Sequence, residues 1–174
     1  AVKGYLAFDA GAYPGDIVIN GTNCMIASYD VENVWIDGYD VLNNKPKTGA
    51  YRAPGTPNSI LATETVIDEI CRELNFEPLE FRLKNAAKQG TRKVDGTANG
   101  RIGFVETLET VRNHPHYAAQ HPGKNCGRGV AFGFSGNTSG PASVVASLVP
   151  DGTVNLVLGS VDIGGTRVGL AQQF

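Results

Sequence analysis

The chain has 174 residues, of which 41% are hydrophobic, and its formal net charge is −2. This length suffices for one domain or two small ones, and the slight negative charge gives no long-range attraction for nucleic acid or an anionic membrane. No hydrophobic run approaches the roughly 20 residues that a transmembrane helix needs. We therefore expect neither a nucleic acid nor a membrane as a partner.

Three segments at the start of the chain show the alternation of β-strands. Residues 1–8, 17–28 and 31–42 are rich in Val, Ile, Tyr and Trp, which favour the pleated, half-buried surface of a sheet. We expect these segments to form an open sheet. Trp35 and Tyr39 are expected to pack within it.

A loop rich in Gly and Pro follows. Residues 49–58 read Gly-Ala-Tyr-Arg-Ala-Pro-Gly-Thr-Pro-Asn, where the glycines permit unusual backbone angles and the prolines restrict them. The loop presents Arg52, whose planar guanidinium has five donors suited to an oxyanion. The alternative is a solvent-facing turn with an ordinary arginine, because turns collect Gly and Pro whether or not they bind a ligand.

Beyond the loop, hydrophobic periodicity predicts a helix over about residues 57–74. Acidic residues, Glu64 among them, are assigned largely to its polar face. Asp68 and Arg72 have the spacing of an i,i+4 ion pair. The helix resembles a scaffold element, so we expect no catalytic role for its glutamates. The residues assigned to its buried face are Ile60, Val66, Ile67, Ile70, Cys71 and Leu74.

Two further helices and a polar connection are expected next. Pro78 suits the first turn of a second helix, and Gly90 suits its C-terminal cap. Residues 91–102 are polar and Gly-rich without hydrophobic periodicity, which makes them the best candidate for a connection between domains. A third helix is predicted over about residues 103–113, ended by Asn113-His114-Pro115.

The last third of the chain returns to the strand pattern. Residues 143–149 and 153–161 flank Pro150-Asp151-Gly152, a combination typical of a β-hairpin. Strands and helices thus occur twice over, which predicts an α+β fold with mixed sheets and packed helices.

The cysteines and histidines give no sign of a metal site. Cys24, Cys71 and Cys126 stand far apart without C-x-x-C spacing, so they cannot assemble an iron–sulfur or zinc site from adjacent thiolates. We expect them to be core thiols. Their odd number, without a signal peptide, favours a reducing compartment such as the cytoplasm. The three histidines, between residues 114 and 121, lie in a Pro-interrupted stretch typical of a surface connector.

An ordered series of motifs gives a more specific indication. Around the loop stand Asp9-Ala-Gly-Ala-Tyr-Pro14, Thr48, Gly49-Ala-Tyr-Arg-Ala-Pro-Gly55, Glu64, Asp68-Glu69 and Glu77-Pro-Leu-Glu-Phe-Arg-Leu-Lys-Asn85. Downstream follow Gly127-Arg-Gly-Val-Ala131, Asp151-Gly-Thr-Val154 and Asp162-Ile-Gly-Gly165. In this order the series resembles the large, molybdopterin-binding subunit of the xanthine dehydrogenase/aldehyde oxidase family, over almost the whole chain.

This resemblance implies an oxidoreductase, a molybdenum hydroxylase that inserts oxygen from water into a C–H bond of an aldehyde or an N-heterocycle. Its cofactor is molybdopterin carrying molybdenum. Iron–sulfur clusters and FAD are expected on partner subunits or domains, where they accept the electrons. The further partners implied are the remainder of the large subunit and a small-molecule substrate.

The family's large subunit is much longer than 174 residues, and the chain does not begin with Met. We therefore expect an internal piece containing parts of two molybdopterin-binding domains. Residues 1–95 would be the C-terminal part of the first, and residues 96–174 the N-terminal part of the second. The family's general-base glutamate and an earlier Gln-bearing loop at the metal are expected outside the chain, so the piece alone is expected to be inactive.

The resemblance also implies roles for two residues of the Gly/Pro loop. In the family, the backbone of the arginine that matches Arg52 lies beside the molybdenum ligands. Two residues further on, Pro54 stands at a position of the substrate pocket where purine-oxidising relatives carry a phenylalanine. That phenylalanine stacks on the substrate, so its absence disfavours a purine.

A second cofactor contact is expected near the end of the chain. In Asp162-Ile-Gly-Gly-Thr166 a strand opens through two glycines into a helix, a geometry suited to holding a phosphate on helix amides. The family usually has Gly-Gln-Gly here, whereas this chain has Gly164, Gly165 and Thr166. A Thr hydroxyl or a Gly amide would have to replace the Gln amide. A glycine turn without a ligand is the alternative.

The Gly-rich run of residues 133–140 also has two interpretations. It could approach the substrate pocket, as its counterpart does in relatives, or it could form a flexible hairpin loop. We assign neither Asn137 nor Thr138 to the pocket.

Two other functions belong to different classes. Asp162-Ile-Gly-Gly-Thr166 also resembles the phosphate-binding turn of actin-like sugar kinases, although those enzymes carry it near their start. A non-catalytic, β-rich interaction module is the third possibility.

Overall fold

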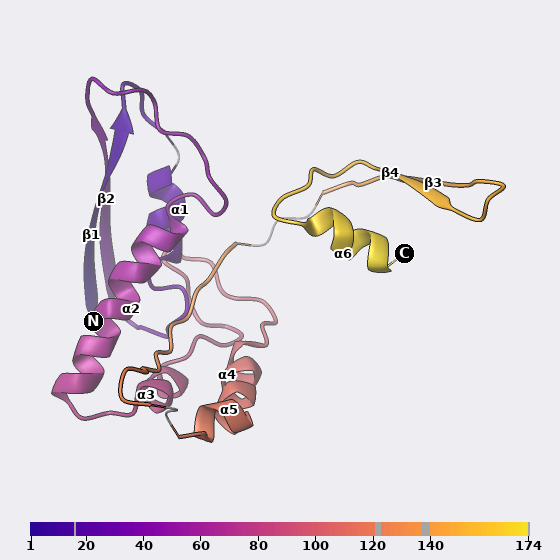
Figure 1. Ribbon diagram of the computed structural model, residues 1–174. Coiled ribbons are helices and arrows are strands. Elements are labelled where there is room, and N and C mark those ends of the chain that lie inside the picture. Colours follow the sequence, from indigo (N-terminus) through magenta and orange to yellow (C-terminus); the bar gives the residue numbers. More distant parts are fainter. Residues whose placement is uncertain (16, 121–122, 137–139, 174) are drawn as a thin grey trace. The chain divides into compact units, whose positions relative to one another are not determined.

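The computed structural model describes residues 1–15, 17–120, 123–136 and 140–173. It divides into two compact units, residues 1–136 and residues 137–174 (Figure 1). The described elements combine helices with small sheets, which confirms the α+β class. Within the described ranges, no helix is both long and hydrophobic enough to cross a lipid bilayer.

Two parallel strands and a connecting helix begin the first unit. β1 (Val2–Gly11) pairs with β2 (Val34–Leu42), and α1 (Ile17–Cys24) lies between them in the sequence. The strand expected over residues 17–28 is therefore wrong. Because β1 and β2 run parallel, the chain must cross back before β2 begins, and a helix is the usual form of this crossover.

Glycines let α1 lie close to the sheet. A Cβ atom on Gly21 would lie 2.8 Å from the ring of Phe8, and one on Gly38 would lie 2.6 Å from Thr22. The packing of α1 on the strands thus outweighs the strand preference of its β-branched residues.

Side chains on the outer face of this sheet are exposed. Trp35 and Tyr39 are 65% and 50% exposed, so the expectation that they pack within the sheet is wrong. The ring of Tyr39 contacts that of Tyr5, with centroids 5.2 Å apart. Each strand has one face turned away from α1, and these aromatic residues lie on it.

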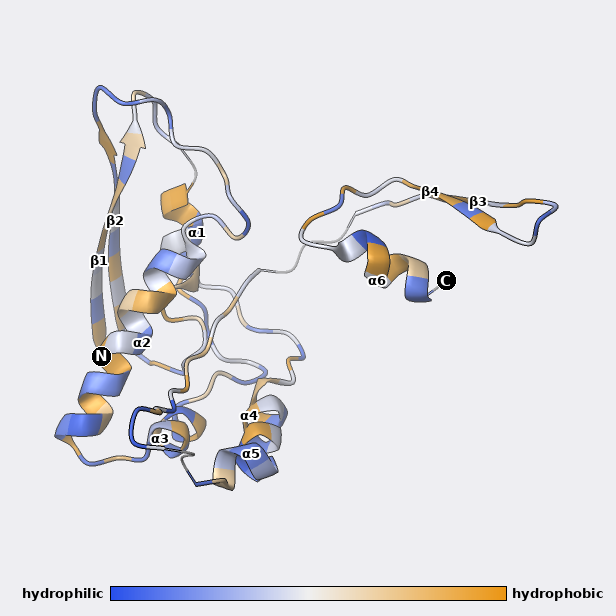
Figure 2. Ribbon diagram, in the orientation of Figure 1, coloured by the Kyte–Doolittle hydropathy of each residue, from blue (hydrophilic) through white to orange (hydrophobic). Residues whose placement is uncertain are grey.

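α2 (Thr56–Glu73) confirms the helix expected over residues 57–74. Figure 2 shows hydrophilic and hydrophobic residues alternating along it, as in a helix with one buried side. The assignment of individual residues is partly wrong. Val66 and Leu74 are 52% and 61% exposed, whereas Glu64 is 5% exposed.

The ion pair expected between Asp68 and Arg72 is also wrong. Asp68 pairs instead with Arg82 of α3 (Pro78–Lys84), with 2.8 Å between Oδ1 and the guanidinium nitrogen. Arg82 lies in the buried contact between α2 and α3, where a charged group must find a partner. Acidic residues of α2 therefore lie against Arg82.

Three short helices surround the hydrophobic core of the first unit. These are α3, α4 (Phe104–Asn113) and α5 (Pro115–Ala118). Leu79 and Leu108 are fully buried and pack with Ala86. Both α3, which starts at its proline, and α4 match the helices expected from the sequence.

The chain after α3 turns back in an ordered loop. α3 ends at Lys84 with Asn85 as its cap, so the expectation that Gly90 caps this helix is wrong. The N–H of Asn85 donates to carbonyls of the last turn, which completes the helix before Gly90 is reached. Gly90, with φ of +86°, donates its N–H instead to the carbonyl of Asn99.

The second unit consists of a hairpin and a helix. β3 (Val144–Leu148) and β4 (Val154–Leu158) are antiparallel, with Val144 opposite Leu158, and they confirm the hairpin expected from the sequence. α6 (Thr166–Gln173) follows β4.

Candidate functional site

The loop that carries Arg52 joins β2 to α2, and its first half is anchored on β1. Thr48 donates its N–H to the carbonyl of Ala10 over 3.2 Å. A Cβ atom on Gly11 would lie 2.1 Å from the carbonyl oxygen of Pro46. The loop therefore crosses the end of β1 where only a glycine leaves room.

The second half of the loop is held against α1. Ala53 and Gly55 have φ of +58° and +75°, in the left-handed region that is uncommon for residues other than glycine. A Cβ atom on Gly55 would lie 2.3 Å from the carbonyl oxygen of Ile17. The N–H of Thr56 donates to Ala53 over 3.1 Å. These contacts fix the backbone beside Arg52, whose side chain is exposed.

The second predicted contact is a glycine turn before α6. Gly164 and Gly165 have φ of +61° and +84°. Asp162 Oδ1 accepts the N–H of Arg167 over 3.1 Å and the hydroxyl of Thr166 over 3.3 Å. The hydrogen bond from the Arg167 backbone holds the pKa of Asp162 below its usual value. The Thr166 hydroxyl and one amide of the first helical turn are thus already used within the turn.

The donors that remain suit an anionic group. A Cβ atom on Gly165 would meet no atom within 4 Å, so a ligand can approach the backbone there. The guanidinium of Arg52 can bind a phosphate or another oxyanion. Arg52 and Pro54 lie in the first unit and the glycine turn in the second, so these are two independent local observations. Each is compatible with an anionic cofactor such as molybdopterin.

A buried charge cluster joins α2 to α3. Glu64 accepts hydrogen bonds from the hydroxyl of Tyr29 and, over 2.9 Å, from Nε of Arg82. Arg82 is fully buried and also binds Asp68. Burial and the bond to Glu64 raise the pKa of Tyr29 above its usual value. Hydrogen bonds to Asp68 and Glu64 outweigh burial and raise the pKa of Arg82.

Sequence reasoning missed this cluster, although a signal was present. Glu64 stands four residues after Ile60, three before Ile67 and seven before Cys71. This spacing places Glu64 within the hydrophobic stripe of the helix and not on its polar face. A glutamate in such a stripe indicates a buried partner.

Other predicted features have mixed outcomes. Cys24 and Cys71 are buried as expected, but Cys126 is exposed because it lies in a turn after residue 123, outside the core. His114 and His116 are exposed, as expected of a surface connector. His121, Asn137 and Thr138 lie outside the described residues.

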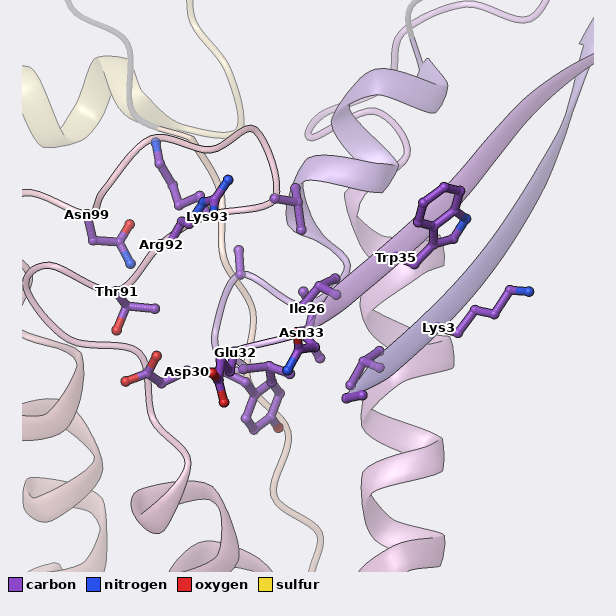
Figure 3. A pocket seen from close by; sticks show the side chains of 17 residues that line it. Lys3, Ile26, Asp30, Glu32, Asn33, Trp35, Thr91, Arg92, Lys93 and Asn99 are labelled. Carbon is purple, nitrogen blue, oxygen red and sulfur yellow. The ribbon is translucent and has the colours of Figure 1, made fainter.

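A cavity of about 760 Å³ opens beside the start of both strands. Figure 3 shows Asp30, Asn33, Arg92 and Asn99 among its lining side chains. Neither Arg52 nor a residue of the glycine turn lines it. Within the described part of the chain, the buried side-chain nitrogen of Asn99 has no hydrogen-bond partner.

Comparison with known proteins relates the chain to one family. Residues 1–86 match the molybdopterin cofactor-binding domain. The large molybdopterin subunit of nicotinate dehydrogenase from Eubacterium barkeri is 32% identical over 64% of this chain and 27% of its own length. The molybdenum-binding subunit of an Escherichia coli xanthine dehydrogenase is 30% identical over 70% of this chain and 18% of its own length. The chain belongs to the xanthine dehydrogenase/aldehyde oxidase family of molybdopterin-binding subunits.

A solved structure of the family supports the same assignment. Aldehyde oxidoreductase from Desulfovibrio gigas matches with a TM-score of 0.68 and 26% identity, over 87% of this chain and 19% of that one. The chain therefore spans 27% or less of the length of each of these three relatives. The match to the molybdopterin cofactor-binding domain ends at residue 86, whereas the first compact unit continues to residue 136. The predicted domain boundary after residue 95 stays a prediction.

Proposed function

We propose that this chain is part of the molybdopterin-binding subunit of a molybdenum hydroxylase, which uses water to hydroxylate an aldehyde or an N-heterocycle. The observation that carries the proposal is the match of residues 1–86 to the molybdopterin cofactor-binding domain. Relatives named for nicotinate, xanthine and aldehyde oxidation support both substrate classes.

In this proposal the Arg52 loop holds one side of the cofactor and borders the substrate. Its backbone is fixed by contacts on β1 and α1, so it can present peptide groups beside the metal without a change of shape. Pro54 forms part of the substrate wall. The bound molybdenum cofactor supplies the oxygen-transfer and electron-transfer chemistry, while the protein supplies binding and orientation.

The glycine turn holds another part of the cofactor. Gly165 offers a backbone that a ligand can approach closely, and both Gly164 and Gly165 have positive φ angles. The Thr166 hydroxyl already bonds within the turn, so it stabilises the shape of the turn more than it replaces the amide of the family's glutamine. The cofactor contact would then come chiefly from backbone amides.

The remaining parts of the enzyme lie outside residues 1–174. They include the general-base glutamate, the Gln-bearing loop at the metal and the iron–sulfur and FAD partners. Within the chain, residues 1–95 would belong to the first molybdopterin-binding domain and residues 96–174 to the second. We place the enzyme in the cytoplasm, in keeping with the odd number of cysteines in this chain.

The alternatives have less support. The sugar-kinase interpretation rests on residues 162–166 alone, whereas the similarity to molybdopterin-binding proteins extends over 64% to 85% of the chain in individual relatives. A non-catalytic module would not need the cofactor-binding domain that residues 1–86 match.

Activity of the intact subunit tests the proposal. The subunit, produced with its natural partners, should reduce a dye in the presence of an aldehyde or a nitrogen heterocycle. A panel of aldehydes, pyridine carboxylates and purines would cover the substrate classes. Molybdenum-loaded protein that oxidises none of them would contradict the proposed activity.

A further inference from the structure

One oxygen of Glu64 ties a distant part of the chain to α2. Besides the Arg82 side chain, Glu64 Oε2 accepts the backbone N–H of Phe132 over 2.9 Å. Phe132 is 68 residues further along the chain, in a stretch outside the helices and strands (orange in Figure 1). The fixed position of this stretch thus depends on a side chain of another element.

The hydrogen bond between Glu64 and Phe132 lies in a buried environment. Glu64 and Arg82 are 5% and 0% exposed, and a buried carboxylate is costly unless hydrogen bonds and an opposite charge satisfy it. The guanidinium of Arg82 also lies 5.7 Å from the ring centroid of Phe132. The same ring also packs against that of Phe104 in a T-shaped arrangement, with 5.5 Å between centroids. Both the backbone and the ring of Phe132 are therefore held.

The direction of the stretch can be read from the next contact. A Cβ atom on Gly133 would lie 3.4 Å from Cδ1 of Ile60. Ile60 stands one turn before Glu64, nearer the start of α2. Passing from Phe132 to Gly133, the chain thus moves toward the end of α2 that follows the Arg52 loop.

We propose that Glu64 is a positioning residue, which fixes Phe132 on α2 and thereby sets where the Gly-rich run from Gly133 to Gly136 lies relative to the Arg52 loop. This inference rests on the proposed function, because it places the run on the substrate side of the same site. Glu64 touches neither substrate nor cofactor in this account. It acts through the backbone of Phe132.

The test uses an apolar replacement of the cluster in the intact subunit. Tyr29→Phe, Glu64→Leu and Arg82→Met are combined, so that no buried charge is left without its partner. The N–H of Phe132 loses its acceptor. Asp68, whose side chain is half-exposed, and the carbonyl of Pro78 lose their bonds to Arg82, and the ring of Phe132 loses its contact with the guanidinium. Hydrogen exchange measured by mass spectrometry should then be on the order of tenfold faster for the peptide that contains Phe132, since one hydrogen bond contributes about this factor. Peptides of α2 and α3 should keep their protection.

Kinetics separate positioning from a merely structural role. In the apolar variant, kcat/KM per bound molybdenum should fall on the order of tenfold, because small misplacements of a substrate wall are costly. The matched control is Asp68→Asn, which removes the other carboxylate partner of Arg82 but leaves the acceptor of Phe132 in place. This control should keep both the exchange rate of the Phe132 peptide and the kcat/KM per molybdenum.

Each outcome decides the proposal. Faster exchange at Phe132 with unchanged kcat/KM per molybdenum would reduce Glu64 to a structural residue and overturn it. A wild-type Phe132 amide that exchanges as fast as an unstructured one would overturn it without any variant, even if the apolar replacement does not fold. If the wild-type subunit has no hydroxylase activity, the proposed function is wrong. The exchange measurement still tests whether Glu64 holds the backbone of Phe132.

Discussion

Arg52 combines an exposed side chain with a fixed backbone. Contacts on both sides of it, from Thr48 to Ala10 and from Gly55 to Ile17, hold the loop in place. In the proposed site this backbone, more than the guanidinium, borders the metal. The side chain then contributes mainly to the shape and charge of the loop.

Replacement of Arg52 tests this role. In the intact subunit, Arg52→Ala should lower kcat/KM on the order of tenfold by changing the local shape and charge of the loop beside the metal. The matched control is Arg72→Ala, an exposed arginine near the far end of α2, which should leave the kinetics unchanged. Steady-state kinetics and molybdenum content would be measured together. If Arg52→Ala kept wild-type kinetics and molybdenum content, Arg52 would be an ordinary loop residue without a role at the metal.

Pro54 predicts the substrate preference. A proline offers no flat π surface, so stacking on a purine is weaker by about 1 kcal/mol, or about fivefold in rate. The enzyme should therefore show a higher kcat/KM for an aldehyde or a smaller heterocycle than for hypoxanthine or xanthine. Pro54→Phe should shift the preference toward the purines. Efficient xanthine oxidation by the unmodified enzyme, with no better substrate in the panel, would mean that another ring supplies the stacking face.

Asp162 gives the glycine turn a dependence on pH. The folded-state pKa of its carboxyl lies below the usual value, so the carboxylate stabilises the turn above the unfolded pKa of about 3.9. This contribution is lost as the pH falls through the lower folded pKa. An NMR titration should find Asp162 titrating below 3.9, with the Arg167 amide shift following the same curve. Titration at or above that value would show that the carboxylate does not cap the turn.

At the scale of elements, the junction between the Arg52 loop and α2 depends on a glycine. Gly55 has φ of +75°, and an added Cβ atom would overlap the carbonyl of Ile17. Gly55→Ala should therefore destabilise the start of α2 by at least about 1–2 kcal/mol. That corresponds to roughly 5- to 30-fold faster hydrogen exchange in the first turn of α2.

The matched control for this junction lies in the same loop. Gly49 is not in the left-handed region, and a Cβ atom added there meets no atom within 4 Å. Gly49→Ala should leave the exchange of α2 unchanged. Equal effects of the two substitutions would show that the close contact at Gly55 does not set the stability of the start of α2.

An element could be predicted from the sequence where the residues that determine it are close together in the chain. α2, α4 and the hairpin of the second unit were predicted because periodicity and turn residues are local. The helix α1 was not, because Ile17 to Cys24 carries β-branched residues and becomes a helix through the crossover between parallel strands. That cause lies in the pairing of distant segments, which local patterns do not contain.

The candidate site shows the same division. The loop of Arg52 and the glycine turn were identified from motifs, and the structure adds the positive φ angles of Gly55, Gly164 and Gly165 and the close approach at Gly55. The cluster of Glu64, Arg82 and Phe132 joins segments that are far apart in the sequence. The sequence signal for this cluster was the position of Glu64 in the hydrophobic stripe of α2.

At the scale of the whole molecule, the chain corresponds to a small part of the length of its relatives. It spans 27% or less of the relatives described above. The proposed cofactor contacts lie in two separate compact units, and the expected general base lies in neither. In the proposed function, a complete site therefore requires the intact subunit.

Molybdenum analysis of two purified proteins tests the central claim most directly. The intact subunit, expressed in a host that makes the cofactor, should contain stoichiometric molybdenum and releasable pterin. The 174-residue chain alone should contain neither, since it lacks the expected metal-site loop. An intact subunit without molybdenum or pterin, from cells in which a related aldehyde oxidoreductase is fully loaded, would contradict the proposed cofactor. Stoichiometric molybdenum in the chain alone would contradict the view that the site needs the rest of the subunit.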